Sequence, residues 1–222
     1  MTAFWTIFVK DLRLELRTRE SMSAMVVFAA AVILLFAFAF DVAPNRFRVF
    51  TPGLMWMTYF FTAVLGLLRT FGQEREMEAY SLLLSAPVER GAIFLGKAAA
   101  FFVFLLAAQV VSLPLFGVFL SMPLLTAPVS MVLILVITDM AIAALGTLIA
   151  GMSLRSPMGE ILLPVLAFPL LTPLLIASSK ATGAALNGAP IGDWDFWLML
   201  LVTYLVLFSL VGTYIFDYIS EQ

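Results

Sequence analysis

Long runs of apolar residues, separated by short polar segments, dominate the hydrophobic pattern of this chain. A membrane-spanning helix needs about 20 consecutive, mostly apolar residues. Six stretches approach or exceed this length: Met22–Phe40, Pro52–Leu68, Ile93–Leu120, Pro128–Met152, Ile161–Ser178 and Phe196–Phe216. No connection between them is long enough to form a soluble domain. The pattern therefore predicts an all-α integral membrane protein with six transmembrane helices, forming a single transmembrane domain over residues 1–222.

Residues 1–20 precede the first span and have an amphipathic pattern. A helix is expected from Ala3 to Arg19, with polar and apolar residues on opposite sides. The polar side carries Thr6, Lys10, Arg13 and Arg17, and the apolar side carries Phe4, Trp5, Phe8, Leu12 and Leu16. Such a helix should lie along the membrane surface. A signal peptide fits less well, because the charged region is long and the apolar run continues to Phe40 without a cleavage site.

The longest polar interruption, Arg69–Lys97, separates the second and third spans. Within it, Gln73–Ser85 has the pattern of a short amphipathic helix. Its apolar positions are Met77, Tyr80 and Leu84, and its polar positions are Glu74, Arg75, Glu76 and Glu78. Pro87 should end this helix, because proline has no backbone N–H to donate. A second helix is expected from about Val88, so residues 73–92 form a loop with its own helix.

Lys and Arg residues are distributed unevenly if both termini are assigned to the cytoplasm. Nine then lie on the cytoplasmic side: Lys10, Arg13, Arg17, Arg19, Arg69, Arg75, Arg90, Lys97 and Arg155. Three lie on the other side: Arg46, Arg48 and Lys180. Because cytoplasmic loops carry an excess of Lys and Arg, the pattern predicts that both termini and residues 73–92 are cytoplasmic. The longest loop on the opposite side, Lys180–Asp195, is too short to fold alone.

The composition agrees with a membrane protein and removes several classes of function. Hydrophobic residues make up 63% of the chain and charged residues 12%, with a mean hydropathy of +1.09; soluble proteins have about 45–50% apolar and about 25% charged residues. The chain contains neither Cys nor His. This excludes thiol chemistry and removes the commonest metal ligand and general base. We therefore expect no metal site, no catalytic residue and no nucleic-acid partner.

One segment partly matches a phosphate-binding loop. Gly91–Lys97 fits the first seven positions of the motif G-x-x-x-x-G-K-[ST], but the eighth residue is Ala98. The motif requires a hydroxyl at that position to hold Mg²⁺, and it requires a preceding strand, whereas the flanks here are predicted to be helical. The segment is not expected to bind nucleotide. Any use of ATP would need an ATPase on another subunit.

The fifth predicted span contains three prolines, Pro164, Pro169 and Pro173. Each removes a backbone hydrogen bond that must be replaced inside the bilayer, so we expect this helix to be kinked or broken. One interpretation is a kink that only serves packing. The other is a pivot beside a translocation path, because irregular backbone at membrane depth is tolerated only against protein or a cavity.

Asp139 lies about midway along the fourth predicted span. An acid at this depth costs about 2.5–3.5 kcal/mol on insertion scales, so it should face other helices. Ala143, Gly146 and Ala150 follow at helical spacing and form a small-residue face that lets another helix approach. No basic residue is predicted at this depth, so Asp139 should be protonated or hydrogen-bonded to Thr or Ser. A structural hydrogen bond and a role in transport are both open.

Two sets of residues resemble known families. The first set follows the order found in the first cytoplasmic loop of ABC-2 type permeases: the acidic cluster, the apolar helix, Pro87-Val88, Arg90, Ile93 and Gly96-Lys97. The segments PGLMW (52–56) and EILLPVLAFPLLTPLLI (160–176) resemble the CcmB family, the heme-exporter B permeases of cytochrome c maturation. The length and the six-span layout fit this family along nearly the whole chain. Asp139 is a departure from the pattern expected in that family's fourth span.

The resemblance implies a permease subunit that couples ATP hydrolysis in a partner to heme export, or to the release of a heme-loaded chaperone. Implied partners are CcmA-like ATP-binding subunits, a second copy of the chain, and CcmC- and CcmD-like proteins of the bacterial inner membrane. Met77, Tyr80 and Leu84 would dock into the ATP-binding subunit, with Glu74 and Glu78 at the rim. No tightly bound cofactor is expected, and heme would be a substrate, because no histidine is available to ligate its iron.

Three alternatives stay open at this point. Another ABC-2 permease could export a lipid, a glycan or a drug, and it would pair with an ATPase unrelated to cytochrome c maturation. A passive membrane scaffold would show no dependence on ATP. An intramembrane enzyme would need a cluster of reactive side chains at one depth, whereas Asp139 stands alone in the predicted spans.

Overall fold

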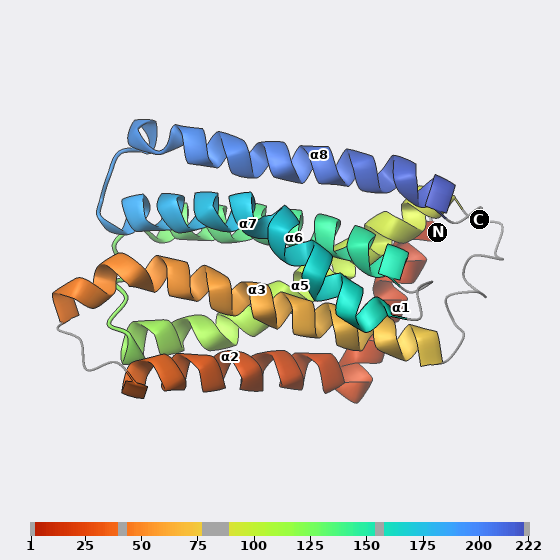
Figure 1. The fold of residues 1–222 in the computed structure, drawn as a ribbon, viewed down its shortest axis with the longest axis horizontal. Helices are drawn as coiled ribbons and strands as arrows, with labels where there is room; N and C mark the ends of the chain where they lie inside the picture. The colour runs from red at the N-terminus through yellow and green to blue at the C-terminus, as the bar shows by residue number, and fades with distance from the viewer. Residues whose placement is uncertain (1–2, 40–43, 77–88, 154–157, 220–222) are drawn as a thin grey trace.

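The computed structural model describes residues 3–39, 44–76, 89–153 and 158–219, and helices make up most of these residues. In chain order the elements are α1 (Ala3–Thr18), α2 (Glu20–Ala39), α3 (Pro44–Glu76), α5 (Arg90–Phe119), α6 (Pro128–Ser153), α7 (Gly159–Leu186), the 3-10 helix η1 (Ile191–Asp193) and α8 (Asp195–Ile219). Figure 1 shows α2, α3 and α5 to α8 along the length of a bundle, with α1 at one end. These six long helices are each apolar enough to cross a membrane, which confirms the predicted fold class.

Successive long helices run in opposite directions along the bundle. In Figure 1, α1 and the end of α8 lie at the right, together with the ends of α3 and α6 and the starts of α5 and α7. The other ends of these helices lie at the left. An even number of crossings thus returns the chain to the end at which it began, and we call this the terminal end of the bundle.

Left-handed backbone marks several helix ends. Arg19, with φ of 54°, separates α1 from α2, and Ser121, with φ of 50°, follows the end of α5. Gly188, with φ of 73°, follows α7, where the N–H of Ala189 donates to the Ala184 carbonyl at 3.1 Å. A glycine in this conformation commonly ends a helix, because it adopts positive φ without strain.

Two helices extend beyond the ends expected from the sequence. Lys180–Asp195 was expected to be a loop, but its first residues are the last two turns of α7. The sequence between Lys180 and Asn187 is rich in alanine, the best helix former, so the helix continues to Leu186. Similarly, Pro52, expected at the start of the second span, lies inside α3, which begins at Pro44.

Helix α6 occupies the centre of the bundle, where it packs against α3, α5, α7 and α8. Ala143 and Ala150 are almost completely buried, as the small-residue pattern predicted. A Cβ atom at Gly146 would lie 2.6 Å from Leu67 Cδ1, so an alanine there would force the Leu67 side chain of α3 to move. Since lipid is as apolar as the helix faces, this close van der Waals packing is what holds the helices together.

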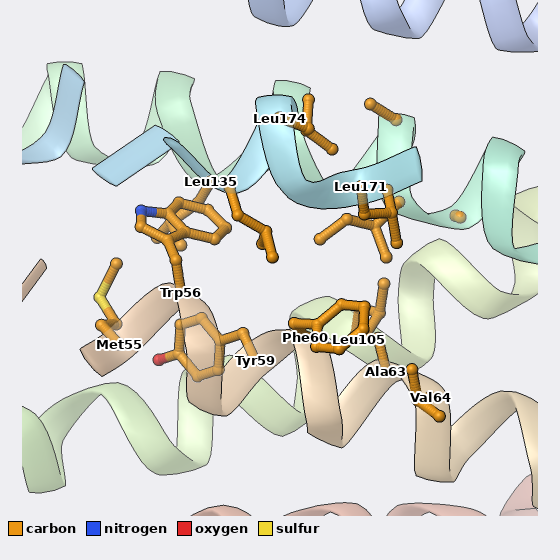
Figure 2. Packing of buried hydrophobic residues seen from close by; sticks show 14 of the residues in the cluster. Met55, Trp56, Tyr59, Phe60, Ala63, Val64, Leu105, Leu135, Leu171 and Leu174 are labelled. Carbon is orange, nitrogen blue, oxygen red and sulfur yellow. The ribbon is translucent and has the colours of Figure 1, made fainter. Parts of the chain in front are cut away.

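Figure 2 shows the apolar core between α3 and α7. Trp56 and Phe60 of α3 point toward α7, and Leu171 of α7 faces them. All three side chains are at most 1% exposed. The ring of Phe60 also meets that of Phe168 edge to face, with the centroids 5.5 Å apart. The core therefore holds α3 against the proline-containing part of α7.

Candidate functional site

Most of the predicted ATPase-coupling residues, Met77, Glu78, Tyr80 and Leu84, lie outside the described residues. Glu74 belongs to the last turns of α3, which runs without a break to Glu76. The expectation that a separate helix starts at Gln73 is therefore wrong, because no breaker separates Leu68 from Glu76 and a single glycine there is tolerated. Helix α5 begins at Arg90, two residues after the expected Val88. The end of α3 and the start of α5 both lie at the terminal end of the bundle (Figure 1).

Helix α1 buries a stripe that helical patterning did not predict. Ile7, Asp11 and Glu15, each one turn apart, are the buried residues of this helix, and α1 packs mainly on α5. Trp5 and Leu16, from the predicted apolar side, are 48% and 68% exposed. These exposed side chains agree with a surface in contact with lipid, while the protein-facing stripe includes two acidic residues.

Both acids of this stripe have specific partners. Asp11 Oδ2 lies 3.7 Å from Lys97 Nζ of α5, and the lysine side chain is only 2% exposed. The Lys97 ammonium also lies 5.1 Å from the centre of the Phe71 ring of α3, in cation–π geometry. Glu15 Oε1 accepts a hydrogen bond from the Met22 N–H at 2.6 Å, at the start of α2. The buried charges of α1 thus join it to α2 and α5, and Lys97 extends the contact to α3.

The Gly96-Lys97 pair is explained by the packing of α1 against α5 and not by phosphate binding. Gly91–Lys97 lies within α5, so most of its N–H groups are engaged in helical hydrogen bonds and cannot cradle a phosphate. A Cβ at Gly96 would lie 3.1 Å from Ile7 Cβ and from the Phe4 carbonyl oxygen. Glycine therefore lets α1 approach α5, and the next residue, Lys97, pairs with Asp11 at the same contact.

Pro164, Pro169 and Pro173 all lie within α7, which continues through them as one helix. Figure 1 shows that its first half is inclined to its second half, so the helix is bent but not broken. The Thr172 hydroxyl donates to the Phe168 carbonyl at 2.6 Å, a type of bond that often accompanies a bend. Pro169 and Pro173 are exposed on the side of α7 that faces away from the bundle.

Asp139 is completely buried and faces α5. Its Oδ1 accepts a hydrogen bond from Gln109 Nε2 at 2.8 Å. Asp139 was expected to be either protonated or hydrogen-bonded to Thr or Ser; the hydrogen-bond partner is Gln109, and the protonated alternative stays a prediction. The Tyr59 hydroxyl of α3 is also buried and has no hydrogen-bond partner among the described residues. Asp139 thus joins α6 to α5 through Gln109, whereas two of the prolines face outward.

A separate apolar groove of about 200 Å³ lies among α1, α5, α6 and α8. Ala98 and Ala99 of α5 face Ala143 and Ala144 of α6 there, and these short side chains leave the space open. Phe4 of α1 closes one part of it. The groove contains neither Asp139 nor any proline of α7, so it is separate from the predicted pivot residues.

Sequence reasoning missed Gln109, Asp11, Glu15 and the burial of Lys97. Gln109 offered a signal, since it is an uncharged polar residue inside the long apolar run of the third span. Lys97 was assigned to the cytoplasmic charges, although two turns of α5 precede it. Acidic residues on the buried side of α1 offered no comparable signal, because their spacing also fits a solvated helix face.

Six helices able to cross a membrane, with a terminal-end helix tied to α5 and a bent helix packed on the core, define a polytopic membrane protein. Comparison with known proteins makes the assignment specific. Residues 2–217 match the family model described as CcmB protein. The chain therefore belongs to the CcmB family, the permease subunits of the ABC transporter for cytochrome c maturation.

Three relatives carry the name heme exporter protein B. The protein from Pseudomonas aeruginosa is 30% identical over 201 residues, which cover 89% of this chain and 88% of the relative. Those from Rhodobacter capsulatus and Paracoccus denitrificans are 29% and 28% identical over 184 residues each, covering 82% of this chain and 83% and 84% of the relatives. The similarity thus extends over most of both chains in each pair.

Proposed function

We propose that this chain uses ATP hydrolysis in a partner subunit to drive heme export, or the release of a heme-loaded chaperone, during cytochrome c maturation. The observation that carries the proposal is the family match over residues 2–217, which includes all six spans and α1. The bacterial inner membrane is the expected location. Heme would be a substrate of the complex and not a resident cofactor of this chain.

The proposed complex contains two CcmA-like ATP-binding subunits, a second copy of this chain, and CcmC- and CcmD-like membrane proteins. An ATP-binding partner is required because Gly91–Lys97, the one segment that partly resembles a phosphate loop, is part of an α-helix. A second copy has apolar surface available to it, since α2, α7 and α8 each expose large apolar side chains. Lipid can cover the same surfaces, so copurification must distinguish the two.

Both chain termini are proposed to be cytoplasmic. The support is the positive-inside charge distribution, together with a bundle in which α1 and the end of α8 share one end (Figure 1). Cysteines introduced at Glu76 and Asn187 should then react with impermeant reagents from opposite sides of the membrane. Labelling of both from outside the cell would overturn this orientation.

The proposed coupling route begins at the helix ends that flank residues 77–88. The route needs α3 and α5 to move together, and Phe71 and Lys97 bring these helices into contact near the terminal end. Lys97 also reaches Asp11, so a displacement of the helix ends would be passed to α1. From α3 the movement would reach α7 through the core around Phe60 and Phe168. In this proposal the bend at Pro169 and Pro173 is the pivot.

Complementation tests the proposal directly. Cells that lack this chain should fail to produce holocytochrome c, and expression of the chain should restore it. An ATPase-inactive form of the partner subunit should abolish the rescue, while a passive scaffold would not need ATP. Normal cytochrome c maturation in the deletion strain would remove the heme-pathway function and favour an ABC-2 exporter of another substrate.

A further inference from the structure

The pair formed by Asp139 and Gln109 leaves one oxygen atom of each side chain without a hydrogen-bond partner. Gln109 Nε2 donates to Asp139 Oδ1 at 2.8 Å. Asp139 Oδ2 and Gln109 Oε1 are both buried, and no described group donates a hydrogen bond to either. Folded proteins rarely leave buried polar atoms unsatisfied, so these two oxygens call for a chemical explanation.

The surroundings of Asp139 are poorly suited to a carboxylate anion. Among the described residues, Lys97 is the buried cation, and it lies 3.7 Å from Asp11. It also precedes Gln109 by twelve residues, about 18 Å along the axis of α5. A buried carboxylate with a single amide donor and no nearby cation is strongly disfavoured relative to the neutral acid.

We propose that Asp139 is a neutral carboxylic acid that holds a proton on Oδ2 and donates it to Gln109 Oε1. A carboxylic acid and a primary amide can form a ring closed by two hydrogen bonds, because each group has one donor and one acceptor on the facing side. The bond from Gln109 Nε2 to Asp139 Oδ1 is one side of that ring. One proton on Oδ2 supplies the other side and satisfies both remaining oxygens.

The sequence left open a structural hydrogen bond and a transport role for Asp139, and a neutral acid paired with Gln109 has the structural role. The acid–amide ring would join α5 to α6 at the centre of the bundle without placing a charge at membrane depth. Asp139 then links α5 and α6 as a neutral group. It does not serve as a charged group during transport. The inference concerns the side-chain pair alone and does not depend on the proposed cargo.

Infrared spectroscopy of the purified full-length chain tests the protonation state. At neutral pH the wild-type protein should show the carbonyl stretch of a protonated carboxylic acid, and the band should shift in ²H₂O and disappear in Asp139→Asn. If Asp139→Asn instead removes carboxylate bands and leaves the acid region unchanged, Asp139 is ionised and the proposal is wrong. Both outcomes can be read without any transport assay.

Matched variants test the ring. Asn at position 139 can form an equivalent amide–amide ring with Gln109, so Asp139→Asn should keep the wild-type unfolding midpoint in detergent. Asp139→Leu and Gln109→Leu each leave one polar partner buried alone and should lower the midpoint, whereas the double variant should lose less than the two single losses combined. A loss in Asp139→Asn as large as that in Asp139→Leu, or additive losses in the double variant, would contradict the ring.

Discussion

The indole Nε1 of Trp56 donates a hydrogen bond to the Thr182 hydroxyl at 2.9 Å, across the contact between α3 and α7. Both side chains are fully buried. Thr182 follows the three prolines of α7, so this bond fixes the regular second half of that helix to α3. The position of the bent first half is then set by the packing around Phe60 and Phe168.

The first prediction concerns this hydrogen bond. Thr182→Val removes the acceptor and leaves a buried indole N–H unsatisfied, so the free energy of unfolding should fall by about 1–3 kcal/mol. In the double variant Trp56→Phe/Thr182→Val neither polar group remains, and its loss should be smaller than the sum of the single losses. Chemical unfolding in detergent micelles measures all three. Strict additivity would show that the bond contributes nothing.

A second prediction concerns the buried ion pair between α1 and α5. Asp11→Asn removes a carboxylate that lies 2.8 Å from Lys10 Nζ and 3.7 Å from the almost inaccessible Lys97 Nζ, and the free energy of unfolding should fall by about 1–3 kcal/mol. Glu20→Gln is the matched control, because Glu20 pairs with Arg69 at 3.0 Å with both side chains about half exposed. The control should cost less than about 1 kcal/mol. Equal effects of the two variants would mean that Asp11 is not a buried partner.

Two glycines provide a matched test of the approach of α1 to α5. Alanine should favour a helix over glycine by about 1 kcal/mol at either position. At Gly72 no atom lies within 4 Å of the added Cβ, so Gly72→Ala should be neutral or stabilising. At Gly96 the Cβ meets Ile7 and the Phe4 carbonyl at 3.1 Å, so Gly96→Ala should gain nothing and Gly96→Leu should displace α1. Faster proteolysis of the N-terminal helix in Gly96→Leu would report the displacement, and unchanged proteolysis would contradict it.

The prolines of α7 test the proposed pivot. Pro169 and Pro173 are exposed, so Pro169→Ala/Pro173→Ala should restore helical hydrogen bonds without removing core contacts. We expect the variant to assemble normally and to support less cytochrome c maturation than the wild type. Leu170→Ala, an exposed position in the same segment, is the control for a change in surface packing. Normal maturation in the proline variant would leave the bend as a packing feature.

The last prediction concerns contact with the ATP-binding subunit. Tyr80→Asp/Leu84→Asp places two charges on the apolar side of the predicted amphipathic helix, and buried apolar anchors carry most of the energy of an interface. The variant should lose copurification with the ATPase while its six spans still insert. Glu76→Gln, outside that apolar side, should retain the partner. Retained copurification and ATPase stimulation in the double variant would remove this helix as the docking site.

The sequence by itself determined the number of spans and their order. Whether a segment can cross a bilayer depends on its own length and apolar content, so the six apolar runs sufficed to locate α2, α3 and α5 to α8. It also determined the small-residue face of α6, because Gly146 removes steric volume in any packing arrangement. The family resemblance carried by the proline segment of α7 was likewise present in the order of residues alone.

Only the tertiary structure decided which side chains meet. Gln109 and Asp139 are thirty residues apart, and nothing in either local pattern links them. The side of α1 that faces protein was also undetermined, because Asp11 and Glu15 on that side have a spacing that also fits a solvated helix face. Lys97 is buried because α1 approaches α5 closely at Gly96, and the sequence alone does not reveal this approach. Which side chains contact one another depends on long-range packing. In a membrane protein the hydrophobic pattern carries little information about these contacts.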